Sequence, residues 1–275
     1  MNIFTLDVEE WYIYSQHPKG GEAFYLPIIN TYLDNILDKL ESTGSKGTFF
    51  CLGSIARNNP EVIKLIDKRG HEIGCHSDKH ILVTDMNPKQ FEDDSRMAID
   101  GIEQLIGKKV QIYRAPAFSI REETKWALEV LISLGITYDS SLSPGKFYFN
   151  GIDTKNLIAP FIVKTKSGTI KEFPINYYNL FSKNIVFSGG GYFRFFPYWF
   201  IKMLTKKSPY NMTYFHIRDF DKYQKRINFK NYFYSYYGIR GAYNKLENYM
   251  SDFKFISIID AANKFNWENA KIIEF

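Results

Sequence analysis

Two histidines stand four residues apart in the segment Cys-His-Ser-Asp-Lys-His, which covers residues 75–80. This spacing lets the imidazoles of His76 and His80 point the same way from one turn of chain, a common arrangement for chelating zinc or a similar divalent cation. The chain holds only five histidines, so a pair at this spacing is informative. The alternative is that both are unrelated surface or loop histidines.

Three carboxylates follow the first apolar run of the chain, at Asp7, Glu9 and Glu10. In a strand, residues i and i+2 share a face, so Asp7 and Glu9 are expected to project together. Two carboxylates beside a cation suit different tasks, because one can bind the metal while the other accepts a proton. An acidic turn or helix cap without chemistry is the alternative.

Arg114 follows an apolar run at residues 110–113 and precedes the rigid Pro116. A guanidinium held in this way can pair with a carboxylate and fix the orientation and ionisation of that group. The same residue could equally be an ordinary surface arginine.

A single histidine, His216, interrupts a late aromatic run, Tyr-Phe-His-Ile-Arg-Asp at residues 214–219. It is a candidate catalytic acid, and Asp139, which ends another apolar run, is a candidate partner for its ring. A hydrogen-bonded histidine in the core is the alternative.

These residues share one property, because each lies within or directly after a segment that the hydrophobic pattern predicts to be a strand. Over residues 1–140 strands and helices alternate, which indicates parallel strands joined by helical crossovers in an open sheet or a barrel. In both folds, functional residues gather where strands end. The expected strands are 2–8, 47–53, 71–75, 110–113 and 136–138, and the expected helices are 26–40, 60–68, 88–106 and 122–134.

The regular alternation fails after Asp139. Residues 140–200 are rich in turn signals, with a strand candidate at 169–174, and we expect an irregular insertion there. A strand at 212–217, a helix at 239–250 and a strand at 253–259 are expected to follow. No internal repeat appears, so one elaborated domain over residues 1–275 is the favoured organisation.

Charge and aromatic residues are unevenly distributed in this chain of net charge +5. Residues 1–140 carry 15 basic and 21 acidic side chains, whereas residues 141–275 carry 20 and 9, together with 34 of the 48 aromatic residues. A basic, aromatic surface could meet anionic lipid headgroups or a sugar carried on a lipid phosphate. It could also be a solvated face over an aromatic core. No nucleic-acid-binding motif accompanies the charge.

The N-terminal sequence and the cysteines bear on where the protein works. Met1 leads directly into a strand-like run, without the pattern of a secretory signal. We therefore expect a cytoplasmic location, with the inner membrane surface as a variant of it. Cys51 and Cys75 lie in apolar runs and are expected to be buried thiols rather than a disulfide or a catalytic pair.

The combined pattern resembles the polysaccharide deacetylases with a NodB homology domain, also called carbohydrate esterase family 4. The His pair matches a His-Ser/Thr-x-x-His metal motif, and residues 114–116 match an Arg-x-Pro motif. The segment 7–11 is similar to the first motif of a branch with Asp-Val-Glu in place of Asp-Asp, which is linked to envelope or exopolysaccharide synthesis. Further similarity lies in Phe215-His216, in the run 189–194 (GGGYFR) and in the region from Tyr237 to Phe255.

The resemblance implies a distorted (β/α)7-type barrel and one divalent metal ion, usually Zn²⁺. It implies His76, His80 and Glu9 as metal ligands, with Glu10 as an alternative to Glu9. It further implies that Asp7 is the general base, that Arg114 holds Asp7, and that His216 is the general acid, oriented by Asp139. Glu9 departs from the family pattern, because its extra methylene group changes the reach of the carboxylate to the metal.

The resemblance also implies the reaction, which is removal of an N-acetyl or similar acyl group from an amino sugar in a polysaccharide or a lipid-linked saccharide precursor. Two alternatives stay open. One is a metal-free, allantoinase-like amidohydrolase of the same fold. The other is a catalytically inactive carbohydrate-binding scaffold.

Overall fold

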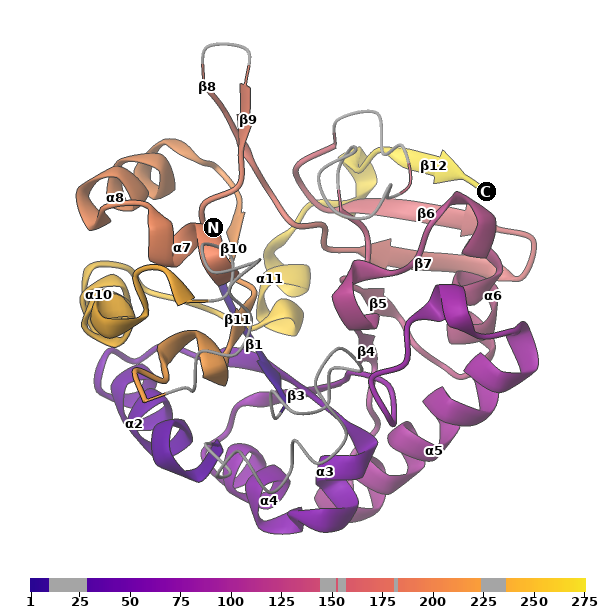
Figure 1. The fold of residues 1–275 in the computed structure, drawn as a ribbon. Coiled ribbons are helices and arrows are strands. Elements are labelled where there is room, and N and C mark those ends of the chain that lie inside the picture. Colours follow the sequence, from indigo (N-terminus) through magenta and orange to yellow (C-terminus); the bar gives the residue numbers. More distant parts are fainter. Residues whose placement is uncertain (10–28, 144–151, 153–156, 181–182, 224–235) are drawn as a thin grey trace. The chain divides into compact units, whose positions relative to one another are not determined.

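The computed structural model describes residues 1–9, 29–143, 152, 157–180, 183–223 and 236–275 (Figure 1). The chain divides into two compact units, and each is assembled from two stretches of sequence. The first unit comprises Met1–Gly47 and Tyr177–Ser257, and the second comprises Thr48–Asn176 and Ile258–Phe275.

The first unit is built around strand β1 (Asn2–Val8), from Ile3 onward a fully buried strand. Two short strands pair with it in parallel, β10 (Asn211–Met212) near its start and β11 (Phe215–His216) near its end. The remaining elements of this unit are α2 (Ile29–Ser42), β8 (Tyr178–Leu180), β9 (Lys183–Ile185), α7 (Gly190–Phe195), α8 (Tyr198–Lys207), the 3-10 helix η6 (Ile217–Phe220) and α10 (Ile239–Asp252).

Aromatic side chains fill the core of the first unit. Phe4 on β1 packs against Phe215 and Phe255, and Tyr249 of α10 packs against Phe255 and Phe193. All five side chains are buried. A fully buried side chain of this size contributes about 1.5–3 kcal/mol, and its edge-to-face contacts add to that. The core therefore anchors β1 and β11, the two strands that carry Asp7 and His216.

The second unit contains a sheet in the order β2-β3-β4-β5-β7-β6-β12. Strands β2 to β5 and β7 run parallel, β6 is antiparallel to β7, and β12 is parallel to β6. The strands are β2 (Gly47–Cys51), β3 (Glu72–Cys75), β4 (Ile112–Tyr113), β5 (Tyr138–Asp139), β6 (Phe161–Thr165), β7 (Gly168–Glu172) and β12 (Ile272–Glu274).

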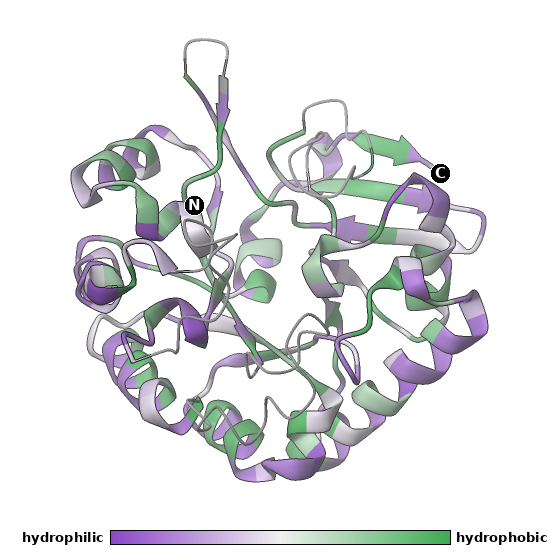
Figure 2. Cartoon of the chain, viewed as in Figure 1, coloured by the Kyte–Doolittle hydropathy of each residue, from purple (hydrophilic) through white to green (hydrophobic). Residues whose placement is uncertain are grey.

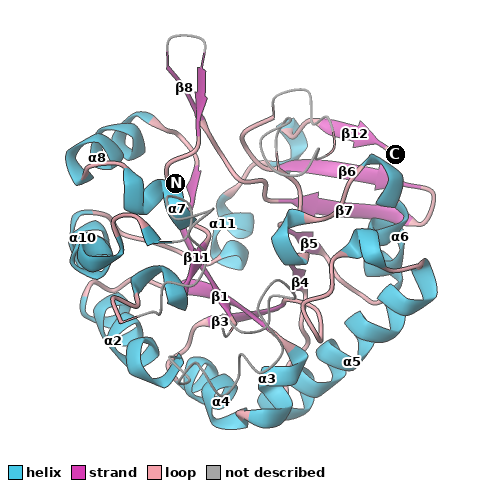
Figure 3. Ribbon diagram, viewed as in Figure 1, coloured by secondary structure: helices cyan, strands magenta, loops and turns pink. Residues whose placement is uncertain are grey.

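Helices cover the strands of this unit, as Figure 3 shows for α3 to α6. They are α3 (Gly53–Asn58), α4 (Pro60–Lys68), α5 (Pro88–Ile106), α6 (Trp126–Ser133) and α11 (Ile258–Lys264), with the 3-10 helices η2 (Val83–Asp85), η3 (Pro116–Phe118), η4 (Glu122–Thr124) and η7 (Trp267–Asn269). None of the helices in the described ranges is long and apolar enough to cross a membrane.

Helix α5 illustrates why these segments are helical. Asn87 and Gln90 form a reciprocal capping box around its start, Pro88 occupies its first turn, and Gly107 ends it at φ 66°. One face, which includes Phe91 and Ile102, is buried, and the hydropathy colours of Figure 2 alternate along the helix accordingly. The prediction of a helix over residues 88–106 is confirmed.

Other expectations hold in part. The helix expected at 60–68 has those bounds, and the helix expected at 26–40 is described from Ile29 to Ser42, with 26–28 outside the described residues. The strand expected at 253–259 is wrong, because only an isolated bridge joins Ile256 to Ile3 and helix α11 begins at Ile258. Within the expected irregular insertion, β6 and β7 form an ordered hairpin that continues the sheet beyond β5.

Candidate active site

The carboxyl end of β1 carries the acidic residues of the candidate site. Asp7 and Glu9 are both buried, and the pairing of β1 with β11 sets His216 beside Asp7 in the register. The Nε2 atom of His216 lies 3.6 Å from Asp7 Oδ2 and 3.8 Å from Glu9 Oε1. Asp7 and Glu9 therefore project to the same side, as the i, i+2 spacing predicts. Glu10, the alternative ligand, lies outside the described residues.

Two threonines fix the strands that bring these groups together. The Thr5 amide donates to Thr213 Oγ1 at 2.7 Å, and the Thr213 hydroxyl donates to the Thr5 carbonyl at 3.0 Å. Both side chains are buried. A slip of one residue would break these bonds and turn Asp7 away from His216, because side chains alternate between faces. The register of β1 against β11 is thus set beside the site itself.

The ring of His216 is oriented by Asp219, three residues later. Asp219 Oδ2 lies 3.1 Å from His216 Nδ1 and accepts the backbone N–H of His216 at 3.0 Å, which closes the first turn of η6. Asp219 also forms a buried ion pair with Arg194, at the end of the Gly-Gly-Gly-Tyr-Phe-Arg run. Carboxylates in this position fix the tautomer and direction of an imidazole.

Asp219, which the sequence pattern does not single out, is a partner of His216, because it contacts Nδ1 of that ring. The expected role of Asp139 in orienting His216 stays a prediction. Asp139 accepts the Ser141 hydroxyl at 2.6 Å and the Ser141 amide at 3.2 Å in the second unit. The local spacing His-x-x-Asp at 216–219 could have revealed Asp219, because it is the spacing of a capped helical turn.

The histidine pair of the second unit follows β3 in a tightly turned loop. Ser77 and His80 have positive φ angles of 68° and 58°, which are uncommon for residues other than glycine. The His80 amide donates to Ser77 Oγ at 3.0 Å and the His76 amide to the Cys51 carbonyl at 2.9 Å. Strained backbone of this kind persists only where the surroundings hold it in place.

The two imidazoles lie close together and are buried. Their ring centroids are 5.2 Å apart, with the planes at 67°. His76 Nδ1 lies 2.8 Å from the Arg114 carbonyl oxygen, an acceptor only, so Nδ1 carries a proton and, in the neutral ring, Nε2 carries the lone pair. A histidine that binds a metal typically donates its other ring N–H in this way. A histidine with this tautomer is chemically suited to bind a metal ion through Nε2.

Asp78, between the two histidines, is buried and braces their loop. The Arg57 guanidinium donates to both carboxylate oxygens of Asp78, at 2.6 and 2.8 Å. The backbone N–H of Asp78 donates to Asp94 Oδ2 at 2.8 Å. Helix α3 approaches so closely that a Cβ at Gly53 would meet Asp78 Oδ1 and come within 2.7 Å of Ala98 Cα. The loop is thus held by the bidentate ion pair with Arg57 and by the close packing of Gly53 in α3.

Arg114 is fully buried at the end of β4. Its guanidinium lies 4.0 Å from the centroid of the Phe50 ring, donates to Ser140 Oγ at 2.9 Å and reaches the Ser140 carbonyl at 3.3 Å. Neighbouring backbone is tied to the same strand end, since the Ala115 amide donates to Ser141 Oγ at 2.8 Å. A buried guanidinium held by a cation–π contact and by hydrogen bonds is a preorganised cation.

A second buried carboxyl pair interacts with Arg114, and the sequence pattern singles out only one of its members, Asp139. Asp139 and Glu172 are partners in the register of β5 and β7, and both are fully buried. Burial raises the pKa of the Glu172 carboxyl well above its usual value, and the charge of Asp139 raises it further. Glu172 accepts the Leu142 amide at 3.0 Å. These two carboxyl groups meet only because β5 pairs with β7, and no local sequence pattern predicts that strand pairing.

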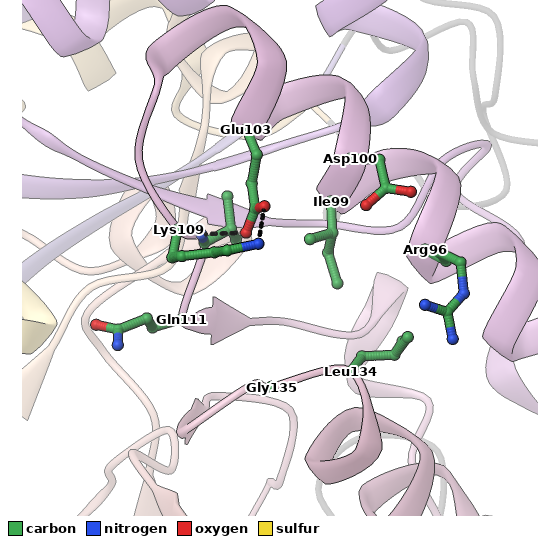
Figure 4. Close-up of a pocket in the computed structure, with 9 residues that line it drawn as sticks. Arg96, Ile99, Asp100, Glu103, Lys109, Gln111, Leu134 and Gly135 are labelled. Carbon is green, nitrogen blue, oxygen red and sulfur yellow. Dashed lines mark hydrogen bonds and ion pairs between the residues drawn. The ribbon is translucent and has the colours of Figure 1, made fainter.

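Two other features of the second unit have no part in this chemistry. Cys51 and Cys75 are buried free thiols, as expected, and burial raises the pKa of Cys75. A hollow of about 270 Å³ lies between α5 and residues 109–111 and 134–135. Figure 4 shows the residues that line it, among which Glu103 accepts a hydrogen bond from the Lys109 ammonium at 2.6 Å. None of the candidate site residues lines it.

Comparisons with known proteins agree with this geometry. Residues 23–138 match the family model described as Polysaccharide deacetylase. Residues 140–263 match a second model, described as Domain of unknown function (DUF3473). The first match contains the His pair and Arg114, and the second contains Arg194, His216 and Asp219.

Among curated relatives, a peptidoglycan-N-acetylglucosamine deacetylase from Bacillus cereus is 32% identical over 99 residues, which are 36% of this chain and 36% of that protein. The chain spans about a third of the length of the first curated relatives that it matches.

Solved structures extend the likeness to the whole fold. The structure of a candidate polysaccharide deacetylase from Mycobacterium smegmatis superposes with a TM-score of 0.62 at 19% identity, covering 100% of this chain and 94% of that chain. BA3943, a carbohydrate esterase family 4 pseudoenzyme from Bacillus anthracis, gives a TM-score of 0.53 at 14% identity, covering 94% and 64%. Identities this low show the fold alone.

Over residues 23–138 the chain is therefore similar to the polysaccharide deacetylase family. The expected fold class, α/β of the NodB-like distorted-barrel type, is confirmed by the parallel strands with helical crossovers and by the solved structures.

Proposed function

We propose that this protein is a metal-dependent hydrolase that removes an N-acetyl or similar acyl group from an amino sugar. The substrate is a polysaccharide or a lipid-linked saccharide precursor, and the product feeds envelope or exopolysaccharide synthesis. The similarity of residues 23–138 to the polysaccharide deacetylase family supports the reaction class, and the relative from B. cereus acts on peptidoglycan N-acetylglucosamine according to its name. The side chains of each unit support the mechanism.

The observation that carries the proposal is the pairing of Asp7 with His216 across strands β1 and β11. A carboxylate and an imidazole 3.6 Å apart are close enough to serve as base and acid at one reacting group. In the proposed reaction Asp7 accepts a proton from the attacking water. His216 then donates a proton to the departing sugar amine, which is a poor leaving group without it.

Asp219 and Arg194 have positioning roles in this proposal. Asp219 holds Nδ1 of His216 and so directs Nε2 towards Asp7 and Glu9. Arg194 neutralises Asp219, because the two form a buried ion pair. A buried, charge-assisted contact of this kind keeps the ring from turning during proton transfer. Arg114 beside Asp7, and a supporting role for Asp139, stay predictions of the sequence pattern.

We propose His76, His80 and Glu9 as metal ligands, all of which are buried. The donor set fits a divalent cation, because the Arg114 carbonyl fixes His76 with its lone pair on Nε2 and His80 lies against it. Two imidazoles and a carboxylate favour Zn²⁺. When bound, such an ion polarises an acyl carbonyl and lowers the pKa of water from 15.7 towards about 7.

The test combines metal analysis of the purified protein with amine release from a panel of N-acetylated amino sugars, chitin oligosaccharides and peptidoglycan fragments. We expect one equivalent of zinc and amine release that chelation abolishes and zinc restores. Amine release that persists without metal would favour the allantoinase-like alternative. Sugar binding without amine release, in fully metal-loaded protein, would favour the inactive scaffold and overturn the proposal.

We also propose that the reaction takes place in the cytoplasm, at the inner membrane surface, where lipid-linked saccharides are presented. The basic, aromatic-rich C-terminal half supports this location. Cell fractionation followed by detection of the native protein tests it, and recovery outside the cell would contradict it.

A further inference from the structure

Exposed aromatic side chains are concentrated in one part of the first unit. Phe195 is 50% exposed, Trp199 68% and Tyr237 42%. Their rings join through Phe196 and Phe200 into a continuous series, with neighbouring centroids 5.1–5.6 Å apart. We call this series the aromatic ladder, in the order Tyr237, Phe195, Phe196, Phe200 and Trp199. Contiguous apolar surface on a folded unit marks an interaction site, whereas single exposed apolar residues do not.

The stretch of sequence that contains most of the ladder is basic. Residues 173–218 include six basic residues and no aspartate or glutamate. On α8, Trp199, Met203 and Lys206 follow the i, i+4, i+7 spacing of one helical face, and Lys206 and Lys207 are exposed in its last turn. The acidic Asp252 that α8 meets is already paired with Lys202 at 2.7 Å.

We propose that the aromatic ladder, with Lys206 and Lys207, is a docking surface for an anionic lipid membrane. Trp and Tyr rings gather at the interface of a bilayer, and nearby lysines are attracted to its anionic headgroups. The two features occur together here. A carbohydrate platform is disfavoured by the ring geometry, because neighbouring planes meet at 45–77° and present no shared flat face to a sugar ring.

The ladder is joined to the candidate catalytic acid by a single short helix. In α7, Phe195 of the ladder directly follows Arg194, which holds Asp219 and through it His216. The Lys245 ammonium fixes this segment by donating to the carbonyls of Phe193, Arg194 and Phe196 at 2.6–3.0 Å. A membrane on the ladder would therefore lie next to the segment that orients His216, which suits a lipid-linked substrate.

Vesicle co-sedimentation of the full chain tests the proposal without any measurement of turnover, so its failure is separable from failure of the proposed hydrolase. We expect binding to vesicles of phosphatidylcholine mixed with phosphatidylglycerol, and much weaker binding to phosphatidylcholine alone or at high salt. Trp199→Ser with Phe195→Ser should weaken binding about tenfold, through loss of buried apolar area. Lys206→Glu with Lys207→Glu should weaken it about 30-fold.

Matched controls make the same changes elsewhere. Met97→Ser with Ile272→Ser alters exposed apolar residues, and Lys68→Glu with Lys264→Glu reverses exposed lysines in the last turns of α4 and α11. These variants should bind as the native protein does. Equal losses in test and control pairs, or native binding in both test pairs, would overturn the proposal. Affinity electrophoresis with chitin oligosaccharides tests the alternative of a glycan-binding surface. The membrane proposal would be replaced by that alternative if these oligosaccharides retained the native protein, if only the Trp199→Ser and Phe195→Ser changes abolished the retention, and if vesicle binding stayed unchanged.

Discussion

His216 is surrounded by carboxylates with distinct tasks. Asp7 and Glu9 face its Nε2 atom, where a substrate would exchange a proton, whereas Asp219 holds Nδ1 and is itself held by Arg194. One imidazole can donate a proton productively only if its other nitrogen is fixed. We therefore expect proton transfer by His216 to depend on Asp219.

Asp219→Asn tests that dependence. The amide keeps the shape of the side chain but loses the charge that pairs with Arg194 and His216, so we expect kcat to fall about 10–100-fold with metal content unchanged. Asp221→Asn is the matched control, because Asp221 is also buried and accepts the Tyr223 amide at 3.0 Å. Full activity of the Asp219 variant would contradict the positioning role.

The histidine pair makes a separate prediction about metal content. His76→Ala should reduce bound zinc to the background, measured by elemental analysis after dialysis, because it removes an imidazole whose tautomer is set for coordination. His71→Ala is the control, since His71 is a buried histidine that packs against Phe49. Equal zinc in the His76 variant and the native protein would exclude His76 as a ligand.

At the scale of elements, the loop after β3 depends on the close approach of α3. Gly53→Ala forces a Cβ against Asp78 and the Ala98 backbone, so we expect a loss of about 1–3 kcal/mol in the free energy of unfolding. Gly101→Ala is the opposite case, because nothing lies within 4 Å of its Cβ position on α5. It should stabilise the protein by about 0.5–1 kcal/mol. Urea denaturation measures both, and an unchanged Gly53 variant would contradict the packing account.

The β5–β7 pair predicts how stability changes with pH. Burial and Asp139 raise the pKa of Glu172 in the folded state, so folding favours its protonated form. That contribution is fully present below the unfolded-state pKa of about 4.3 and is lost as the pH rises through the raised folded-state pKa. Glu172→Gln mimics the neutral acid. Its stability relative to the native protein should therefore rise between pH 5 and pH 8 on a thermal melt, and a constant difference would contradict this.

Local sequence patterns predict the helices whose start signals lie in their own sequence. Asn87 with Gln90 defines the start of α5, and Pro60 defines the start of α4. Helix α11 was missed because its N-terminal amides are capped from other elements. Ile258 donates to Thr48 Oγ1 at 2.9 Å, and Ile259 donates to Glu72 Oε2 at 2.8 Å. The sequence near residue 258 does not predict that Thr48 and Glu72 accept these hydrogen bonds.

At the scale of the molecule, the order of motifs along the chain predicts the fold class, because parallel strands place their carboxyl ends at one edge. The same order selects Asp7, Glu9, His76, His80, Arg114 and His216 as candidates. The sequence does not predict Glu172, because its partner is set by the pairing of β5 with β7. It does not predict the role of Arg194 either, because that role depends on a buried ion pair. One domain over residues 1–275 stays a prediction.

The most direct test of the central claim is acetate release from N-acetylated glycans by zinc-loaded native protein, compared with Asp7→Asn and His216→Asn. The account predicts one acetate for each amine freed by the native protein. Each variant should lose about 100-fold or more in rate while keeping its zinc, since a positioned acid or base contributes about 10²–10⁴-fold. Unchanged acetate release in both variants, or none from the zinc-loaded native protein on any of these substrates, would contradict it.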